Sequence, residues 1–290
     1  MAVLTKVLAN TLGDQKVVGL CHGLFSNYTF IQDVFNLQSE NQIKIRFGGI
    51  NHFFWILDFK IPEGDGYFLL NKKLGGKTIQ EIYKKEGLDF LLSSELYENY
   101  GYLPFIHDRH ICEFFNCYIN SKDVFDRYKL KRYHISDREK SYDDAAKNIE
   151  KWTRGDPGLN TTPSRESAAD MIKSIVFDES YIDVVNVVNN GQITNLPIGS
   201  VVETLGQINS LGCTPFTVGA LPQPIKMLVQ PHAENQLSII EASQSGDLNK
   251  ALMCLAAEPS SAHLTISSIK QMGKELLEPN KKYLTQFFKV

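Results

Sequence analysis

The chain has 290 residues, 43% hydrophobic and 22% charged, a composition typical of globular proteins. A formal net charge of -3 and a sequence pI of about 6.2 give no electrostatic basis for binding nucleic acid or an anionic membrane. No apolar run approaches the roughly 20 residues that span a bilayer, there is no signal-peptide pattern, and five irregularly spaced cysteines favour free thiols in a reducing cytoplasm.

The N-terminal third interleaves predicted helices and strands. Leu4, Val7 and Leu8 share one helical face, whereas Ile43 and Ile45 alternate with charged residues as in a half-buried strand. The predicted elements are a helix over 2–12, a strand over 17–20, a helix over 23–37, a strand over 43–47, a strand over 53–61 and a helix over 79–92.

The rest of the chain continues this mixed order. The predictions are a helix starting near 108, irregular structure over 118–138, an exposed helix over 139–151, a mobile loop over 153–163, a helix starting at Thr162-Pro163, β structure over 181–188, a strand ending near 203 and two or three closing helices. Strict alternation is absent, so we predict an α+β fold with a mixed or antiparallel sheet packed by helices in one domain.

A thiol and two imidazoles stand at predicted strand ends. The apolar run from Val17 stops at Cys21-His22, and a glycine pair precedes Asn51-His52. A thiolate and a neutral imidazole suit a divalent cation, which makes Cys21 and His52 candidate metal ligands. Buried cysteine is more often an inert hydrophobe, and the residues alone leave both interpretations open. His22 is a candidate acid or oxygen-binding group, or a solvated turn residue.

A second group places a carboxylate, a guanidinium and an imidazole in Asp108-Arg109-His110. Pro104 favours a loop before Asp108, so the three side chains stand at a loop–helix junction. There they could converge on an anionic substrate, with Asp108 as a base. The alternative is a helix cap followed by two exposed charges, which the residues alone favour.

Five segments taken together resemble a known family. They are VVGLCHG, GGINHFFWI, DRHICEFF, NNGQITNLPIGSVVE and VGALP, and they extend over nearly the whole chain in this order. The combination resembles glycoside hydrolase family 4, the NAD- and manganese-dependent glycosidases. The Cys-His pair is similar to the branch that acts on unphosphorylated sugars, and the DRH segment to its α-galacturonidase type.

The resemblance implies both a fold and a site. Residues 1–290 would form a domain like the C-terminal domain of lactate and malate dehydrogenases, with a mixed sheet and packed helices and without the N-terminal Rossmann domain. Cys21 and His52 would hold Mn²⁺ or another divalent cation. His22 would lie near the glycosidic oxygen and Asp108 would be the base. The implied substrate-binding residues are Asn51, Arg109 and His110.

The implied reaction hydrolyses an α-linked hexuronide or hexoside without the usual carboxylate pair. NAD would oxidise the C3 hydroxyl, which makes the C2 proton acidic because it is then alpha to a ketone. Deprotonation at C2, elimination at C1, addition of water and return of the hydride complete the cycle. The divalent cation would act as a Lewis acid on the C2 and C3 oxygens.

The chain differs from this family by starting as if within the segment that ends the Rossmann domain, and its twenty glycines include no G-x-G-x-x-G pattern. We therefore expect activity to need an NAD-binding domain, which a separate gene would encode, and we expect an exposed apolar patch on the 2–12 helix. The opposing hypothesis is a truncated remnant that folds but turns nothing over. A malate dehydrogenase-like oxidoreductase is disfavoured by the Cys-His and Asn-His pairs. Expected partners are a small sugar or uronide and other copies of the chain in a homo-oligomer.

Overall fold

The computed structural model describes residues 1–13, 16–132, 134–156, 158 and 165–288. Its α-helices are α1 (Ala2–Leu12), α2 (Leu24–Phe35), α3 (Gly66–Leu74), α4 (Ile79–Ile82), α5 (Leu91–Tyr100), α6 (Asp108–Ile111), α7 (Asn116–Ile119), α8 (Lys122–Arg127), α9 (Ile135–Thr153), α10 (Ala168–Phe177), α11 (Gln223–Ser245), α12 (Leu248–Ala257) and α13 (Ile266–Leu277). Its strands are β1 (Lys44–Ile50), β2 (Phe53–Ile61), β3 (Gly64–Asp65), β4 (Tyr181–Val188), β5 (Val201–Asn209) and β6 (Gly212–Pro215).

The described strands form one six-stranded sheet in the order β3-β2-β1-β5-β4, with β6 paired to β5. All pairings between these strands are antiparallel. The β1–β2 hairpin meets the later strands at a narrow joint, where Gly49 of β1 pairs with Glu203 of β5. This joint brings segments that are distant in sequence to one place, and the candidate site is built around it.

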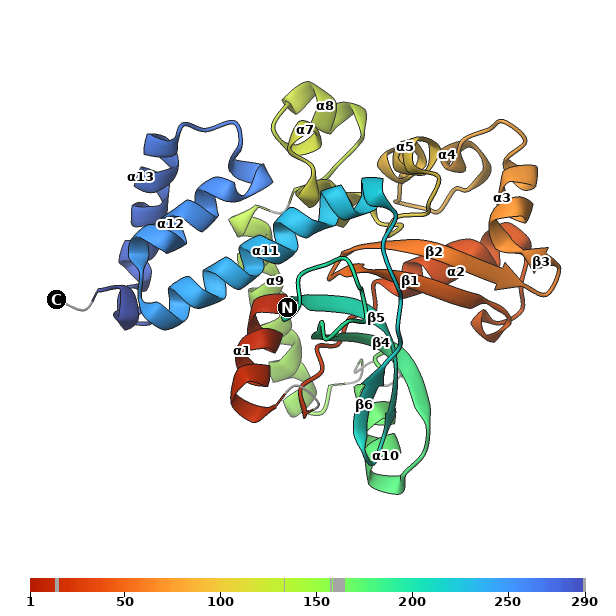
Figure 1. The fold of residues 1–290 in the computed structure, drawn as a ribbon, viewed down its shortest axis with the longest axis horizontal. Coiled ribbons are helices and arrows are strands. Elements are labelled where there is room, and N and C mark those ends of the chain that lie inside the picture. The colour runs from red at the N-terminus through yellow and green to blue at the C-terminus, as the bar shows by residue number, and fades with distance from the viewer. Residues whose placement is uncertain (14–15, 133, 157, 159–164, 289–290) are drawn as a thin grey trace.

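Helices cover the sheet and explain its buried strands. Strand β2 is buried at all but two of its nine positions, as its apolar sequence predicts. Helix α3 packs against β2, α11 against both β1 and β2, and α1 and α10 against β4 and β5. Figure 1 shows α11 as the long helix that crosses the molecule, with α12 and α13 beyond it. The predictions of strands over 53–61 and 181–188 are confirmed.

Three element predictions are wrong. The strand predicted to end near 203 instead begins at Val201 and continues to Asn209. Residues 17–20 form no strand, because only Gly19 pairs, in an isolated bridge with Asn186. The predicted helix over 79–92 is interrupted after Ile82, where Tyr83 is extended and Gly87 has a φ of 73°. Two separate helices, α4 and α5, take its place.

The middle of the chain is more helical than predicted. Short helices α7 and α8 occupy much of the region 118–138, whereas the exposed helix over 139–151 is confirmed as part of α9. The predicted mobile loop over 153–163 and the helix start at Thr162-Pro163 lie largely outside the described residues. Helix α11 continues through Pro231.

Helix α1 turns its larger apolar side chains toward solvent. Ala2, Thr5 and Ala9 face the molecule, while Leu4 and Leu8 are 70% and 50% exposed. This confirms the expected apolar patch. Across the described residues, no helix combines the length and apolarity needed to cross a membrane. The five cysteines are all free, in agreement with the prediction of free thiols.

Candidate functional site

The Asn51-His52 turn joins β1 to β2 as a two-residue loop closed by the Ile50–Phe53 pair. His52 has a φ of 63°, a left-handed conformation that costs a residue other than glycine about 1–2 kcal/mol. Gly49 lets the strands approach, because a β-carbon there would lie 2.3 Å from the Phe53 carbonyl oxygen. The glycine pair before the turn therefore has a steric reason.

The carboxylate of Glu203, on the neighbouring strand β5, forms hydrogen bonds with this turn. Its Oε2 accepts hydrogen bonds from Asn51 Nδ2 and the His52 backbone N, both at 3.3 Å. The side chain is fully buried, and burial raises the pKa of Glu203 to about 7, while hydrogen bonds from Asn51 and His52 oppose the shift. Sequence reasoning gave Glu203 no role, since its partner lies on a strand far away in sequence.

Cys21 lies beside the same carboxylate. Gly19 and Asn186 exchange two backbone hydrogen bonds of 2.9 Å, and Asn186 pairs with Glu203 across β4 and β5. Burial, reinforced by the charge of Glu203, raises the pKa of the Cys21 thiol to about 12. The Gly23 backbone N donates to Cys21 Sγ at 3.3 Å, so the start of the following helix α2 fixes the sulfur.

Three buried polar atoms in this group have no hydrogen-bond partner among the described residues. They are Glu203 Oε1 and the Asn186 side-chain atoms Oδ1 and Nδ2. Cys21 and Asn186 lie near enough to lower the pKa of Glu203, but neither makes a hydrogen bond of ordinary geometry to Oε1. Such unpaired buried groups are rare in folded proteins and often mark sites that bind something.

Three imidazoles and a phenyl ring cover the outer side of the turn. The His52 ring centroid lies 4.9 Å from that of His110 and 5.4 Å from that of Phe105. The His107 and His110 centroids are 4.5 Å apart. Burial is the main cause that lowers the pKa of His52, and it lowers the pKa of His107 to about 4. The lowered pKa values favour the neutral imidazole, which is the form that binds a cation. Sequence reasoning missed His107.

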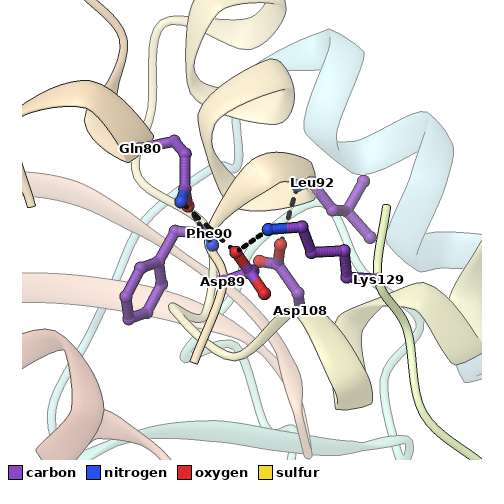
Figure 2. A network of polar contacts seen from close by, with 6 residues as sticks. All are labelled: Gln80, Asp89, Phe90, Leu92, Asp108 and Lys129. Carbon is purple, nitrogen blue, oxygen red and sulfur yellow. Dashed lines mark hydrogen bonds and ion pairs between the residues drawn. The ribbon is translucent and has the colours of Figure 1, made fainter. Parts of the chain in front are cut away.

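Asp108 points into the N-terminus of α5. Its carboxylate accepts hydrogen bonds from Leu92 N at 2.7 Å, from Ser93 N at 3.0 Å and from the Ser93 hydroxyl. Figure 2 shows the contact with Leu92 beside the ion pair of Asp89 and Lys129. Burial raises the pKa of Asp108 to about 6 against these lowering hydrogen bonds. Asp108 is thus a cap, as the alternative interpretation held, but for α5 rather than for its own helix.

A cavity of about 440 Å³ opens beside this carboxylate. His22, His107, Asp108 and Arg109 are among its lining residues, whereas Cys21, Asn51 and His52 are not. His22 is exposed, and its Nδ1 lies 3.2 Å from Glu166 Oε1. The structure therefore brings the predicted site residues together as two neighbouring groups. His107 connects them, because it lines the cavity and contacts His110, which in turn contacts His52.

Sequence comparison relates the chain to glycosidases. Residues 47–261 match the family described as "Family 4 glycosyl hydrolase C-terminal domain". An α-galacturonidase from Thermoanaerobacter italicus is 27% identical over an alignment that covers 98% of this chain and 66% of that protein. The chain thus spans slightly less than two thirds of the length of this relative.

Structure comparison gives the same picture of the fold. A crystal structure of a Bacillus subtilis protein named as a glucosidase superposes with a TM-score of 0.86 at 25% identity, covering 96% of this chain and 66% of that one. A 6-phospho-alpha-glucosidase from gut microorganisms, solved with NAD and Mn²⁺, superposes with a TM-score of 0.73 at 18% identity, covering 97% of this chain and 65% of that one. The predicted α+β fold with packed helices is confirmed.

Proposed function

Because the chain belongs to glycosyl hydrolase family 4, as its match over residues 47–261 shows, we propose that it is the metal- and substrate-binding domain of a glycosidase. This domain would comprise residues 1–290 and work in the reducing cytoplasm as part of a homo-oligomer. The proposed activity is hydrolysis of an α-linked hexuronide or hexoside, when the domain is completed by an NAD-binding domain.

One observation carries this proposal: the Cys21 side chain and the backbone of the Asn51-His52 turn, which come from different segments, both lie against Glu203. The thiol lies beside the carboxylate and the His52 backbone N donates to it. Sulfur and imidazole nitrogen form a donor pair suited to a borderline divalent cation, and Glu203 Oε1 is an unpaired oxygen near them. No group of three or more His, Cys, Asp or Glu side chains in the described part of the chain could hold a metal. A cation held by Cys21 and His52 would therefore need its other donors from the substrate, from water or from outside the described residues.

Residues of this chain would supply the proton transfers of the proposed reaction. A dinucleotide, when bound, supplies a hydride acceptor for C3, and a cation supplies Lewis acidity to the sugar oxygens. His22 lies on the cavity with Glu166 at its Nδ1, which suits proton transfer to the departing glycosidic oxygen. We propose Asp108 as the base for the C2 proton. It would first have to release a hydrogen bond from α5, and its pKa near 6 suits a base working at neutral pH.

The charge of the cavity favours an anionic sugar. Five Lys or Arg side chains line it against three carboxylates, and Arg109 is the cation next to the proposed base. Arginine binds carboxylates through two parallel hydrogen bonds, which a neutral sugar does not offer. We therefore rank an α-linked hexuronide above a neutral α-galactoside. The α-galacturonidase name of the Thermoanaerobacter italicus relative agrees with this ranking.

The test uses the isolated chain with NAD, Mn²⁺ and a thiol reductant against an α-galacturonide. We expect a folded protein without turnover, because no residue of the chain can accept the C3 hydride. Adding a separately expressed family 4 NAD-binding domain should restore measurable hydrolysis. Turnover by the isolated chain would contradict the mechanism, and no turnover after completion would favour the inactive remnant.

A further inference from the structure

Glu203 stands where three distant segments of the chain meet. It pairs with Gly49 of β1 on one side and with Asn186 of β4 on the other. Asn186 holds Gly19 through a pair of backbone hydrogen bonds, and Gly19 lies two residues before Cys21. The carboxylate is therefore the shared neighbour of both predicted metal ligands, although it lies on neither segment.

The contacts of Glu203 constrain where the His52 imidazole can go. The bond from the His52 backbone N to Oε2 holds this residue in its left-handed conformation, and the bond from Asn51 Nδ2 fixes the other turn residue. With the backbone so held, the imidazole lies against His110 and Phe105. Without these two hydrogen bonds, His52 could leave its left-handed conformation, and its imidazole would then point in another direction.

We propose that Glu203 is a positioning residue that sets the separation of the Cys21 sulfur and the His52 imidazole. The proposal rests on the proposed function, since it concerns the same predicted cation site. Glu203 would act through the geometry of its hydrogen bonds, so an uncharged acceptor at the same place should hold the Asn51-His52 turn almost as well. Glutamine keeps such an acceptor, whereas methionine fills a similar volume without one.

Co²⁺ titration of the full chain under reducing conditions tests this, followed by the thiolate-to-cobalt absorption band. Cys21→Ser should abolish the band and His52→Ala should weaken binding strongly. Glu203→Met should weaken Co²⁺ binding about 10- to 100-fold, the usual effect of losing a group that orients a metal ligand. Glu203→Gln should stay within about threefold of wild type. The matched control is Asp183→Asn, a buried carboxylate on β4 that should bind Co²⁺ like wild type.

A second measurement needs no cation. The His52 backbone amide should exchange with deuterium at least about tenfold faster in Glu203→Met than in wild type or Glu203→Gln, because exchange requires the hydrogen bond to open. Glu203→Met leaves the donors of Asn51 and His52 without their acceptor, which lowers stability, so circular dichroism checks that the variant is folded before exchange is measured.

The outcomes separate the two proposals. Normal Co²⁺ binding and normal His52 exchange in Glu203→Met, with binding lost in Cys21→Ser, would overturn the role of Glu203 and leave the metal site intact. Co²⁺ binding by Glu203→Gln that is as weak as that of Glu203→Met would also overturn the role of Glu203, since the charge of the side chain and not its acceptor would then matter. Unchanged Co²⁺ binding in both Cys21→Ser and His52→Ala would refute the metal site and this inference with it.

Discussion

Glu203 and Asp108 are both buried carboxylates with raised pKa values, but their surroundings differ. Asp108 has donors on both oxygens, all from the first turn of α5. Glu203 has donors only on Oε2, and its Oε1 has no partner among the described residues. A carboxylate whose oxygens accept hydrogen bonds from a helix N-terminus stabilises the fold. A carboxylate with an unpaired buried oxygen can still bind a ligand or a side chain that coordinates one.

The same contrast extends to the two regions around these residues. The Glu203 region gathers the Cys21 thiol, the Asn51 amide and the His52 backbone at the strand joint, which is suited to fixing ligand donors. The Asp108 region forms an open cavity with an excess of cations, which is suited to recognising charge. Changes in the first should therefore weaken cation binding, and changes in the second should affect substrate choice, folding and, through Asp108, the transfer of the C2 proton.

The largest expected effect comes from Cys21→Ser in the completed enzyme. It should lower kcat/KM with Mn²⁺ at least about 100-fold, because even groups that only orient a metal ligand account for 10- to 100-fold. The free energy of unfolding should change by less than about 1 kcal/mol, since the thiol is only half-buried. Cys254→Ser, a buried thiol on α12, is the control and should retain activity. Equal activity in both variants would show that Cys21 has no special part in activity.

Arg109→Gln should act on substrate choice. The ratio of kcat/KM for an α-galacturonide over a neutral α-galactoside should fall about 10- to 100-fold, because charge-assisted hydrogen bonds contribute roughly 1.5–3 kcal/mol. Steady-state kinetics on both substrates measures this ratio. Arg127→Gln on α8 lies away from the cavity lining and should leave the ratio unchanged. A wild-type preference for the neutral sugar would refute the ranking of substrates.

Asp108→Asn should reveal a folding role through its pH dependence. The pKa of Asp108 is raised to about 6 in the fold, so its protonated form is favoured there. Its contribution to stability is complete below about pH 4 and is lost as the pH rises through 6, by up to ~3 kcal/mol. The variant also leaves the Leu92 amide unpaired, which costs about 1–3 kcal/mol. Wild type should therefore exceed Asp108→Asn most at pH 4, and the gap should narrow toward pH 7.

Urea unfolding at pH 4, 5, 6 and 7 measures that gap. Ser93→Ala keeps the carboxylate but removes a hydrogen bond that lowers its pKa, so its stability should still depend on pH, with the loss shifted to higher pH. A gap independent of pH would mean that Asp108 titrates as it does in the unfolded chain. Exchange of the substrate C2 proton with solvent, followed in the completed enzyme, tests the base separately: normal exchange in Asp108→Asn would assign that role to another group.

Local patterns were enough to predict much of this fold. Strands β2 and β4 have the predicted bounds because each is a continuous apolar, β-rich run between turn signals. The helix over 79–92 failed because periodicity outweighed the left-handed Gly87, which a helix interior cannot accommodate. The 17–20 strand failed because an apolar run shows neither its partner nor how much of it pairs.

The candidate site was predicted less completely, for a physical reason. The Asn51-His52 turn and Cys21 are visible in sequence because polar, chemically active residues interrupt apolar runs there. Glu203 is hidden, because its role depends on a pairing with β1 across more than a hundred residues. The orientation of Asp108 could not be predicted either, since nothing in its own segment shows that its carboxylate accepts hydrogen bonds from the first turn of α5. Long-range pairing converts single residues into a site, and sequence patterns record only the local part of it.

The smallest expected effect comes from Lys131→Gln on the cavity rim. Lys131 is exposed and has no ion-pair partner among the described residues, so the free energy of unfolding should change by less than about 0.5 kcal/mol. It should lower kcat/KM for the uronide only severalfold, mainly at low ionic strength, because exposed charges act over distances that salt screens. Lys140→Gln on exposed α9 is the matched control, with the same loss of charge away from the cavity. If both variants respond alike, the effect comes from the overall charge of the protein and the cavity has no special part in it. If only Lys131→Gln responds, and only to the uronide, the cavity itself recognises the anion, as the contrast with the Glu203 region requires.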